Sequence, residues 1–458
     1  MSLALKVWDA ERLIGELTHD AQFNRYTFIY ANSWITADNS YSLCPRLPLD
    51  NAGLSPERHS ADARNFFQNL LPEGRALDDA AATYSISKGN LAGLLHALGR
   101  ESAGALMFTS GATAPQGSAH FRLPRSLPPA ELSQRIRNRP AHPFTLWDGR
   151  LRLSIAGYQD KLAVLQSHGQ WFLPETAQQS STHIIKPEPV NPNLTGMTTN
   201  ELMCMLLAKA VRIPVAHVRL DHVPEPVLVI ERFDRLVTHE GNDADAGDMV
   251  VQRLPCIDGC QALGLPVEYK YERLYGDGPD VKDIREGASL PQFFKLLDDK
   301  QQVRATATAR LEFLRWVIFQ VLIGNTDAHA KNLSFFSDSQ RLALAPAYDL
   351  VCGLAMRDAN IADNLAMAVG DNFDPRTIRA YDWALMAHEC AIAPRLLVNA
   401  VKTLATQAMN VLPDIKAEAL IQGGSLAMVE RVAAVVRSQC KAALACVGEI
   451  LAIRSDSF

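Results

Sequence analysis

Apolar and polar residues alternate with a period of two in the first part of the chain, a pattern typical of short β-strands. Elsewhere in this part, apolar residues recur at helical spacing. The predicted elements are two strands and two helices, at residues 6–8, 26–30, 61–71 and 90–98. A polar segment with proline and glycine, 110–117, then breaks the pattern. We therefore expect a small mixed unit over residues 1–110.

Strand signals dominate from about residue 145 to 235, within the second part, 111–245. Runs rich in Val, Ile and Leu predict strands at 151–155, 162–166, 183–186 and 227–233. One helix, 199–211, interrupts them, and its apolar positions are Leu202, Met205, Leu206 and Ala210. The acidic, glycine-bearing stretch 238–248 is expected to form a solvated loop. This part is predicted to be a β-rich lobe with one helix.

Helical patterns dominate beyond about residue 290, within the third part, 246–458. Two apolar stripes predict long helices, one from Leu311, Leu314, Ile318, Val321 and Leu322 and one from Val429, Val432, Val436, Cys440, Leu444 and Val447. Between them lies one predicted strand pair, 333–336 and 342–345. The three parts together predict an α+β fold.

Composition narrows the class of protein. The chain has 458 residues, enough for two or three packed units, with 48% hydrophobic and 21% charged residues. A net charge of -5 gives no global field that would attract nucleic acid, and Arg376 and Arg379 are expected to be solvated helix residues. No apolar run approaches the roughly 18 residues of a membrane span. These features favour a cytoplasmic protein without membrane contact.

Eight cysteines are scattered along the chain, several within apolar helical patterns. Cysteine behaves there as a small buried hydrophobe, so disulfides are not expected. Cys256 and Cys260 are spaced for one helical face, but no second pair of ligands lies nearby in the sequence. A structural role is therefore favoured over a zinc site.

A polar loop from Asn325 to Asn332 follows the helix that ends near Gly324. Asp327 and Asn332 have the spacing of the Asp and Asn in the kinase catalytic loop H-R-D-x-x-x-x-N, although the His-Arg prefix is absent. Asp349 follows the strand pair, where a kinase has the metal-binding Asp of D-F-G. Taken singly, each Asp would be interpreted as a turn or cap residue. Together they predict a general base, Asp327, and two oxygen ligands for Mg²⁺.

A kinase also needs groups that hold the ATP phosphates. Lys186 ends the apolar run 183–185, and the alternative is a surface lysine at a strand end. Residues 155–161 form a turn with one glycine, a weak signal for phosphate binding by backbone N–H groups. The strand 227–233 could offer its backbone to the adenine, and by pattern alone it is a buried strand.

The sequence resembles the HipA family of toxin kinases from bacterial type II toxin–antitoxin modules, over essentially the whole chain. Besides the Asn325–Asn332 loop and Tyr348-Asp349, the matching segments are Phe66-Phe67-Gln68-Asn69-Leu70-Leu71-Pro72, residues 153–161, Ser181-Thr182-His183-Ile184-Ile185-Lys186-Pro187, Glu231-Arg232-Phe233-Asp234-Arg235 and Arg253-Leu254-Pro255.

The resemblance implies a bilobal, protein-kinase-like fold. An extra N-terminal subdomain (1–110) would precede a mixed β/α ATP-binding lobe (111–245) and a mainly α-helical catalytic lobe (246–458). The implied activity is ATP-dependent phosphorylation of a serine on a protein, with aminoacyl-tRNA synthetases as the target class. The implied partner is a HipB-like helix-turn-helix antitoxin, through which the chain would reach operator DNA.

The resemblance also implies residue roles. Asp327 is the catalytic base, and Asn332 and Asp349 bind magnesium. The residues expected around ATP are Ala156, Gly157, Tyr158, Gln159, Asp160, Lys161, Lys186, Glu231, Arg232, Phe233, His329, Lys331, Asn332, Tyr348 and Asp349. Ser154 is the expected autophosphorylation site, where a phosphate would add about -1.5 to -2 charges and repel the nucleotide. Two alternatives stay open: a small-molecule phosphotransferase and a non-catalytic ATP-binding component of a repressor complex.

Overall fold

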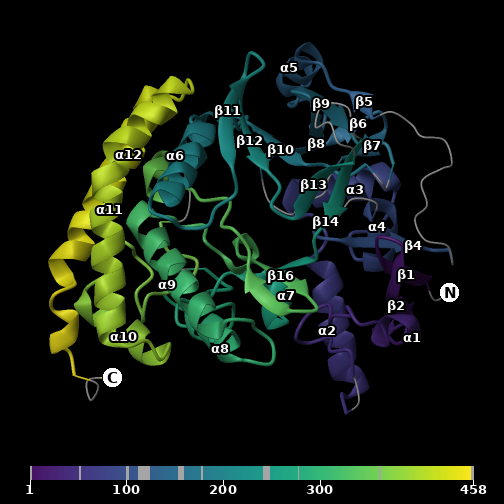
Figure 1. Ribbon diagram of the computed structural model, residues 1–458, viewed down its shortest axis with the longest axis horizontal. Helices are drawn as coiled ribbons and strands as arrows, with labels where there is room; N and C mark the ends of the chain where they lie inside the picture. Colours follow the sequence, from purple (N-terminus) through teal and green to yellow (C-terminus); the bar gives the residue numbers. More distant parts are fainter. Residues whose placement is uncertain are drawn as a thin grey trace. The chain divides into compact units, whose positions relative to one another are not determined.

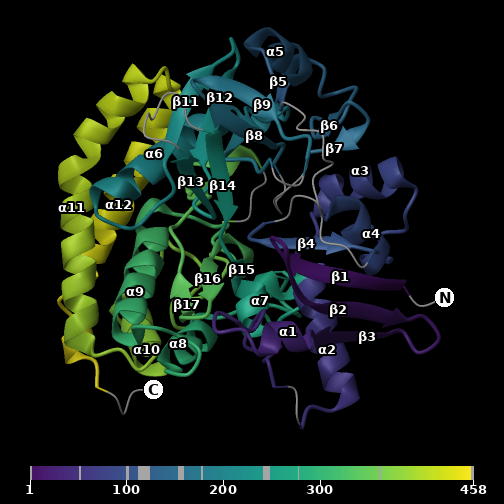
Figure 2. The same ribbon diagram turned by 45° about the vertical axis from the view of Figure 1, so that its right-hand side comes forward.

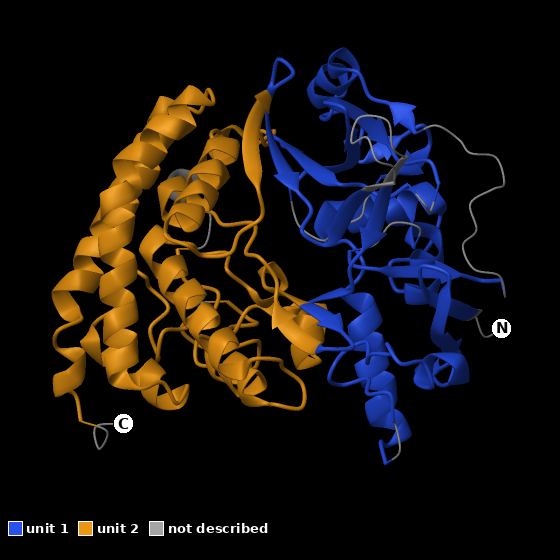
Figure 3. Cartoon of the chain, viewed as in Figure 1, with its two compact units in different colours: residues 1–187, 222–257, 336–340 blue, residues 188–221, 258–335, 341–458 orange. Residues whose placement is uncertain are grey.

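The computed structural model describes residues 3–50, 53–99, 103–111, 124–152, 159–176, 179–240, 248–276, 278–359, 363–454 and 458. The chain divides into two compact units (Figure 3). Unit 1 comprises residues 1–187, 222–257 and 336–340, and unit 2 comprises 188–221, 258–335 and 341–458. Both contain helices and strands, so the chain is a mixed α/β protein. The three-part division with boundaries near 110 and 245 stays a prediction.

The elements of the first half of the chain, labelled in Figure 1, lie mostly in unit 1. The strands are β1 Leu3–Asp9, β2 Arg12–Asp20, β3 Arg25–Tyr30, β4 Leu106–Thr109, β5 Arg125–Ser126, β6 Leu146–Trp147, β7 Arg150–Leu151, β8 Leu162–Ser167, β9 Gln170–Leu173, β10 His183–Pro187, β11 Val218–His222, β12 Pro226–Glu231, β13 Arg235–Glu240 and β14 Asp248–Arg253. The helices are α1 Asn32–Ile35, α2 Pro56–Gln68, α3 Gly74–Tyr84, α4 Leu91–Leu98 and α5 Pro129–Arg137.

A four-stranded antiparallel sheet begins the chain, in the order β3–β2–β1–β4; Figure 2 shows β1, β2 and β3 side by side. Leu5 and Val7 of β1 are fully buried, as the alternation predicts. Helix α2 packs on this sheet, where the ring of Phe67 lies 5.4 Å from that of Phe28 and 6.0 Å from that of Phe108. The two helices and two strands predicted here are confirmed, whereas β2 and α3 were not foreseen.

A six-stranded sheet has the order β11–β12–β10–β8–β9–β5. Its central strand β10 pairs antiparallel with β12 and β8, which sets Ile185 opposite Val229 and Leu162. These three side chains belong to one buried apolar cluster. Because side chains alternate along a strand, Lys186 lies on the opposite face of the sheet from Ile185.

The strands predicted at 162–166 and 183–186 are confirmed. The run at 227–233 is strand only as far as Glu231, so Phe233 lies beyond it. The run at 151–155 is strand only at Leu151, the end of β7, and its residues 153–155 lie outside the described part of the chain.

The loop predicted at 238–248 is only partly right. Strand β13 continues to Glu240 and β14 begins at Asp248, and the two pair in register from Arg235 opposite Arg253 to Glu240 opposite Asp248. Ladder hydrogen bonds between the strands stabilise this extended backbone despite its acidic composition. The amino-acid composition of a single segment does not reveal whether that segment pairs with another strand.

The remaining elements lie mostly in unit 2. The helices are α6 Met197–Ala210, α7 Gly259–Leu263, α8 Leu290–Asp298, α9 Thr306–Ile323, α10 Ala380–Glu389, α11 Pro394–Ile421 and α12 Leu426–Cys446. Short 3₁₀ turns are η1 Pro192–Leu194, η2 Val267–Lys270, η3 Ala330–Asn332, η4 Gly353–Ala359 and η5 Ile450–Ala452. The strands are β15 Cys256–Asp258, β16 Ser334–Asp338 and β17 Arg341–Leu344, which form a three-stranded sheet in that order.

Helices α6, α9, α11 and α12 pack against one another, with α11 and α12 side by side (Figure 1). Helix α9 is buried on several faces from Phe313 onward. Two residues of the predicted stripes are nevertheless exposed, Leu311 by 41% and Leu444 by 36%. Leu311 lies in the first turns of α9, which reach the surface. The rest of α9 forms a rigid support that leads directly into the predicted catalytic loop.

Two predictions about helices are wrong, one for a pair of cysteines and one for a pair of arginines. Cys256 lies in β15 and Cys260 in α7, so they do not share a helical face. All eight cysteines are free thiols. Arg376 and Arg379 are exposed, as predicted, but they precede α10 instead of lying within a helix. Arg376 forms ion pairs with Asp363 and Asp374 at 2.9 and 2.7 Å. Within the described residues, no helix is long and apolar enough to cross a membrane.

Candidate active site

The predicted catalytic loop begins where α9 ends. Gly324 ends the helix with a φ of +63°, and a Cβ there would lie 2.9 Å from Leu354 Cδ1. Both the left-handed backbone and the close packing favour glycine. Asn325 is buried; its Nδ2 donates to Gln320 Oε1 at 2.8 Å, and its Oδ1 accepts the Asp327 N–H at 2.9 Å. A buried helix thus fixes the start of the loop.

The rest of the loop is held by its own hydrogen bonds. The carbonyl of Asp327 accepts two of them at 2.8 Å, from Asn332 Nδ2 and from the His329 N–H. The carbonyl of His329 in turn accepts the Asn332 N–H at 2.9 Å. The side chain of Asp327 remains 48% exposed. The structure therefore brings Asp327, His329 and Asn332 together with an accessible carboxylate on an immobilised backbone.

Asn332 and Asp349 carry the donor atoms that magnesium prefers. The Nδ2 of Asn332 is used within the loop, which leaves its Oδ1 as the atom for a cation. Asp349 lies close enough to His329 for its carboxylate to act on the pKa of that imidazole. The described residues contain no cluster of three or more His, Cys, Asp or Glu side chains that could hold a metal alone. An amide oxygen and a carboxylate, completed by phosphates and water, nevertheless fit Mg²⁺.

His329 is buried and uncharged. Burial lowers the pKa of His329 to about 3; the Lys270 ammonium adds to this effect and Asp349 opposes it. Its Nδ1 makes no hydrogen bond within the described structure. Because the imidazole is neutral, the 3.9 Å between its Nε2 and Asp327 Oδ1 is not an ion pair. The position of His329 beside the nucleotide stays a prediction.

Lys331 anchors the loop to helix α7. Its Nζ lies 2.7 Å from Asp258 Oδ2, and its side chain is 2% exposed. Asp258 also caps α7 through a reciprocal capping box with Gln261. Gly259 permits close approach, since a Cβ there would lie 2.5 Å from the Ala330 carbonyl oxygen. Lys331 therefore has a structural partner, and its contact with ATP stays a prediction.

Tyr348 ties the segment before Asp349 to the same loop. Its hydroxyl donates to the Lys331 carbonyl at 2.7 Å and is 2.8 Å from Ser334 Oγ. The preceding Ala347 exchanges hydrogen bonds with residues 214–216. The predicted residues of unit 2 thus lie on one connected framework.

Replacing Lys331 by methionine should lower the free energy of unfolding by about 1–3 kcal/mol, because Asp258 would keep a largely buried carboxylate without its ammonium partner. Urea denaturation followed by tryptophan fluorescence measures the change. Lys295→Met, at an exposed position of α8, is the matched control and should change stability by less than about 0.5 kcal/mol. Equal losses in the two variants would contradict the anchoring role.

The lysines predicted to contact phosphate lie in unit 1. Lys161 and Lys186 are only 8% and 6% exposed. Lysine is seldom buried to this extent, because removing an ammonium from water is costly. Lys186 is therefore not the surface lysine of the simpler alternative. Its contact with ATP, and that of Lys161, stay predictions.

Arg232 belongs to a buried ionic network. Its Nε and Nη2 donate to the Asp234 carboxylate at 2.9 and 2.7 Å, and its Nη1 donates to Ser181 Oγ at 2.8 Å. Asp234 also accepts Arg235 Nη1 and the Gly104 N–H, both at 2.9 Å. Burial alone would raise the pKa of Asp234, but the two guanidiniums and these hydrogen bonds outweigh it and lower that pKa. The Arg232 guanidinium is thus engaged in holding unit 1 together.

Glu231 and Phe233 flank Arg232 in the sequence and lie in different surroundings. Glu231 is exposed at the end of β12. The Phe233 ring lies 6.0 Å from that of Phe336, edge to face. The Arg232 N–H donates to the Thr182 carbonyl at 2.9 Å, which extends the pairing of β12 with β10 by one residue. The predicted adenine contacts of residues 231–233 stay predictions.

Four predicted residues, Ser154, Ala156, Gly157 and Tyr158, lie outside the described part of the chain. Gln159, Asp160 and Lys161 follow at its edge. Asp160 forms a 3.4 Å ion pair with Arg139, whose side chain is 7% exposed. This ion pair attaches the residues that follow the segment 153–158 to the residues after α5.

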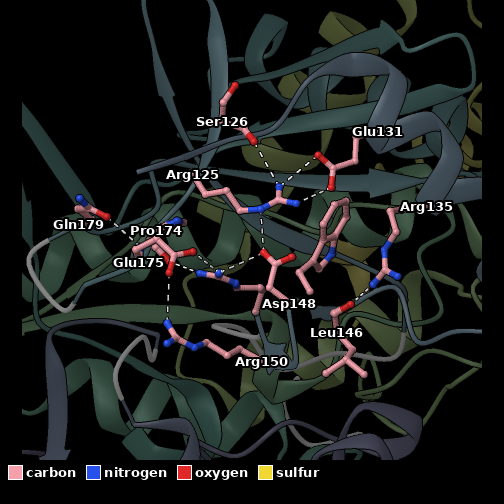
Figure 4. Close-up of polar contacts among 12 residues, drawn as sticks. Arg125, Ser126, Glu131, Arg135, Leu146, Asp148, Arg150, Pro174, Glu175 and Gln179 are labelled. Carbon is pink, nitrogen blue, oxygen red and sulfur yellow. Dashed lines mark hydrogen bonds and ion pairs between the residues drawn. The ribbon is translucent and has the colours of Figure 1, made fainter. Parts of the chain in front are cut away.

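A network of ion pairs lies around the residues that precede the segment 153–158 (Figure 4). Arg152, 8% exposed, donates to Glu175 Oε1 at 2.5 Å. Arg125 donates to both oxygens of Glu131, at 2.6 and 3.2 Å, and lies 2.8 Å from Asp148. Charged side chains from several segments therefore fix the backbone that enters residues 153–158.

Two residues that contact the catalytic loop were not foreseen. Tyr271 donates its hydroxyl proton to Asp327 Oδ1 at 2.5 Å, from 56 positions earlier in the chain. No local sequence signal marks it. Asp258 and Gln261 do have the spacing of a capping box, which the sequence could have revealed. The link from Asp258 to Lys331 depends on tertiary structure alone.

Comparison with known proteins identifies relatives of the whole chain. The family model described as HipA-like C-terminal domain matches residues 153–412, and the HipA N-terminal domain matches 5–109. The serine/threonine-protein kinase toxin HipA of Shewanella oneidensis is 35% identical over 416 residues, 90% of this chain and 89% of the relative. The putative kinase Y4mE of Sinorhizobium fredii is 33% identical and covers 90% of this chain and 92% of its own length.

A solved structure agrees with these sequence matches. In the complex of HipA, HipB and operator DNA from Shewanella oneidensis MR-1, the similar chain superposes with a TM-score of 0.83 at 33% identity. The match covers 98% of this chain and 100% of that one. Sequence and structure therefore agree that the chain belongs to the HipA family.

Proposed function

We propose that this chain is an ATP-dependent protein serine/threonine kinase with a bilobal, protein-kinase-like fold. The observation that carries the proposal is the bond from Asn332 Nδ2 to the Asp327 carbonyl, which immobilises the loop and leaves the Asp327 carboxylate accessible. A general base needs this combination of fixed position and access to substrate. The names of the relatives, a kinase toxin and a putative kinase, support the same activity.

The proposed reaction transfers the γ-phosphoryl group of ATP to a serine hydroxyl. Asp327 accepts the hydroxyl proton while the serine oxygen bonds to the γ-phosphorus. The bond from that phosphorus to the β,γ-bridging oxygen breaks, and ADP leaves. Asn332 Oδ1 and Asp349 would hold Mg²⁺, which supplies positive charge beside the phosphates. Lys186 is proposed as the lysine that binds the ATP phosphates.

The proposed biological role is that of a toxin in a HipA/HipB-like module. The structural relative from Shewanella oneidensis forms a complex with HipB and operator DNA. By analogy, the partner of this chain would be a HipB-like helix-turn-helix antitoxin, with operator DNA bound through that antitoxin. An aminoacyl-tRNA synthetase is the proposed target, so phosphorylation would inhibit translation in the cytoplasm.

Regulation is proposed to act through autophosphorylation of Ser154. The test treats the purified chain with phosphatase, removes the phosphatase, adds Mg-ATP and measures intact mass. The wild-type chain should gain one phosphate that maps to Ser154, whereas Ser154→Ala should gain none there.

Ser126→Ala, at an exposed serine of β5, is the matched control and should gain the phosphate as the wild type does. Phosphate on another residue would reject the Ser154 assignment and keep the kinase proposal. A wild-type chain that transfers phosphate neither to itself nor to any protein of a cell lysate would contradict the kinase proposal itself.

A further inference from the structure

We propose that Tyr271 is a positioning residue for Asp327: its hydroxyl holds Oδ1 so that Oδ2 is presented to the hydroxyl of the target. The inference rests on the proposed kinase function and deepens it. It starts from one contact, the 2.5 Å hydrogen bond from Tyr271 Oη to Asp327 Oδ1. A hydrogen bond from a hydroxyl to an ionised carboxylate is charge-assisted and about twice as strong as one between neutral groups.

The backbone that carries Tyr271 is fixed. A Cβ on Gly287 would lie 1.8 Å from the Tyr271 carbonyl oxygen, so only glycine fits beside it. The Gly287 N–H donates to the Glu272 carbonyl at 3.1 Å, and the Ala288 N–H donates to the Tyr269 carbonyl at 2.9 Å. These two bonds clamp residues 269–272 against 287–288.

A buried carboxylate next to Tyr271 strengthens this support. The Glu272 side chain is 2% exposed, lies 2.6 Å from an Arg285 nitrogen and accepts the Ala368 N–H at 2.8 Å. The Glu272 N–H also donates to the Ala366 carbonyl at 2.9 Å. Tyr271 therefore extends from a segment that is attached to residues 285–288 on one side and 366–368 on the other.

The ring of Tyr271 is fixed as well. It packs edge to face against the His329 imidazole, with ring centroids 5.0 Å apart and planes at 85°. His329 is buried in the catalytic loop and neutral, because burial lowers its pKa. The Lys270 Nζ lies 5.5 Å from the centroid of the tyrosine ring. Contact with the loop thus sets the position of the hydroxyl relative to Asp327.

This hydrogen bond acts on the side chain of Asp327. Asn325 and Asn332 hold its backbone, whereas the terminal torsion of an aspartate side chain has a broad energy minimum. Binding one carboxylate oxygen restricts that torsion. A base must lie within hydrogen-bond reach of the proton it accepts, so the restricted orientation raises the fraction of productive encounters.

Tyr271→Phe removes only the hydroxyl and tests the proposal. The initial rate of phosphate incorporation from labelled Mg-ATP into protein is measured as a function of ATP concentration. We expect kcat to fall about tenfold, which corresponds to about 1.4 kcal/mol, with KM for ATP within about twofold of wild type. Thermal unfolding should stay within about 2 °C, since the ring and its packing are kept.

Tyr269→Phe is the matched control. It removes a hydroxyl two positions away that makes no hydrogen bond with another described residue, so kcat should not change. Unchanged kcat in Tyr271→Phe would overturn the positioning role. A fall in Tm with kcat preserved at low temperature would indicate a structural role and would overturn it equally.

A crystal structure of Tyr271→Phe separates this inference from the kinase proposal. We expect the Asp327 carboxylate to rotate or to occupy two conformers in the variant and one in the wild type. A single unchanged conformer would reject the positioning role whether or not the chain transfers phosphate. Absence of transfer by the wild type, with a rotated carboxylate in the variant, would reject the kinase proposal alone.

Discussion

Asp327→Asn is expected to lower the initial rate of phosphoryl transfer by about 10²–10⁴-fold, the usual contribution of a general base. Asparagine keeps the size of the side chain, and the loop is held through the carbonyl and N–H of residue 327. The variant should therefore fold and bind ATP as the wild type does while lacking the group that accepts the proton. Labelled Mg-ATP with phosphatase-treated protein measures the rate, and equilibrium dialysis measures ATP binding.

Asp299→Asn provides the control for this variant. Asp299 is exposed in unit 2, and its Oδ1 accepts the Gln301 N–H in a turn, a role that asparagine also performs. Its transfer rate should equal that of the wild type. If Asp327→Asn kept more than about a tenth of the activity, the assignment of Asp327 as the base would be wrong.

Asp234→Asn is expected to cost about 3–5 kcal/mol of unfolding free energy, because it leaves two buried guanidiniums without their carboxylate. The side chains of Arg232 and Arg235 are 1% and 0% exposed, so water does not replace the lost partner. Urea denaturation at pH 7 measures the loss. Asp38→Asn, at an exposed position of unit 1, is the control and should be nearly neutral.

Because the folded-state pKa of Asp234 is lowered, we expect the stability of the protein to fall as the pH falls. The folded-state pKa of Asp234 is lowered, so its carboxylate stabilises the protein above the unfolded pKa of about 3.9 and this contribution is lost as the pH falls. The stability difference between the wild type and Asp234→Asn should therefore shrink below about pH 4. A difference that stays constant down to pH 2 would contradict the ionic explanation.

The network around Asp234 gives the Glu231-Arg232-Phe233-Asp234-Arg235 motif a structural role beside its predicted contacts with the nucleotide, which stay predictions. A motif beside a predicted nucleotide strand suggests ligand contacts, yet Arg232 donates to Asp234 and Ser181, and Arg235 donates to Asp234 and to the Gly104 carbonyl at 3.0 Å. Arg235 joins segments 131 positions apart, and Arg232 joins segments 51 positions apart. Stability of unit 1 accounts for these contacts without a ligand.

The sequence by itself determined features that depend on neighbouring residues. The helical period and Gly324 predicted where α9 ends, because apolar spacing and a left-handed glycine act within a few positions. The five-residue spacing of Asp327 and Asn332 predicted a catalytic loop, and the structure joins the two through a hydrogen bond. The runs rich in Val, Ile and Leu predicted β8 and β10 for the same local reason.

Only the tertiary structure decided the contacts that make this loop specific. Tyr271 reaches Asp327 across 56 positions, and Asp258 reaches Lys331 across 73. The strand register of β13 and β14 likewise depends on pairing across the hairpin, which overrides an acidic local composition. Such contacts depend on how separate elements pack, and the free energy that selects them comes from burial and pairing that no short stretch of sequence contains.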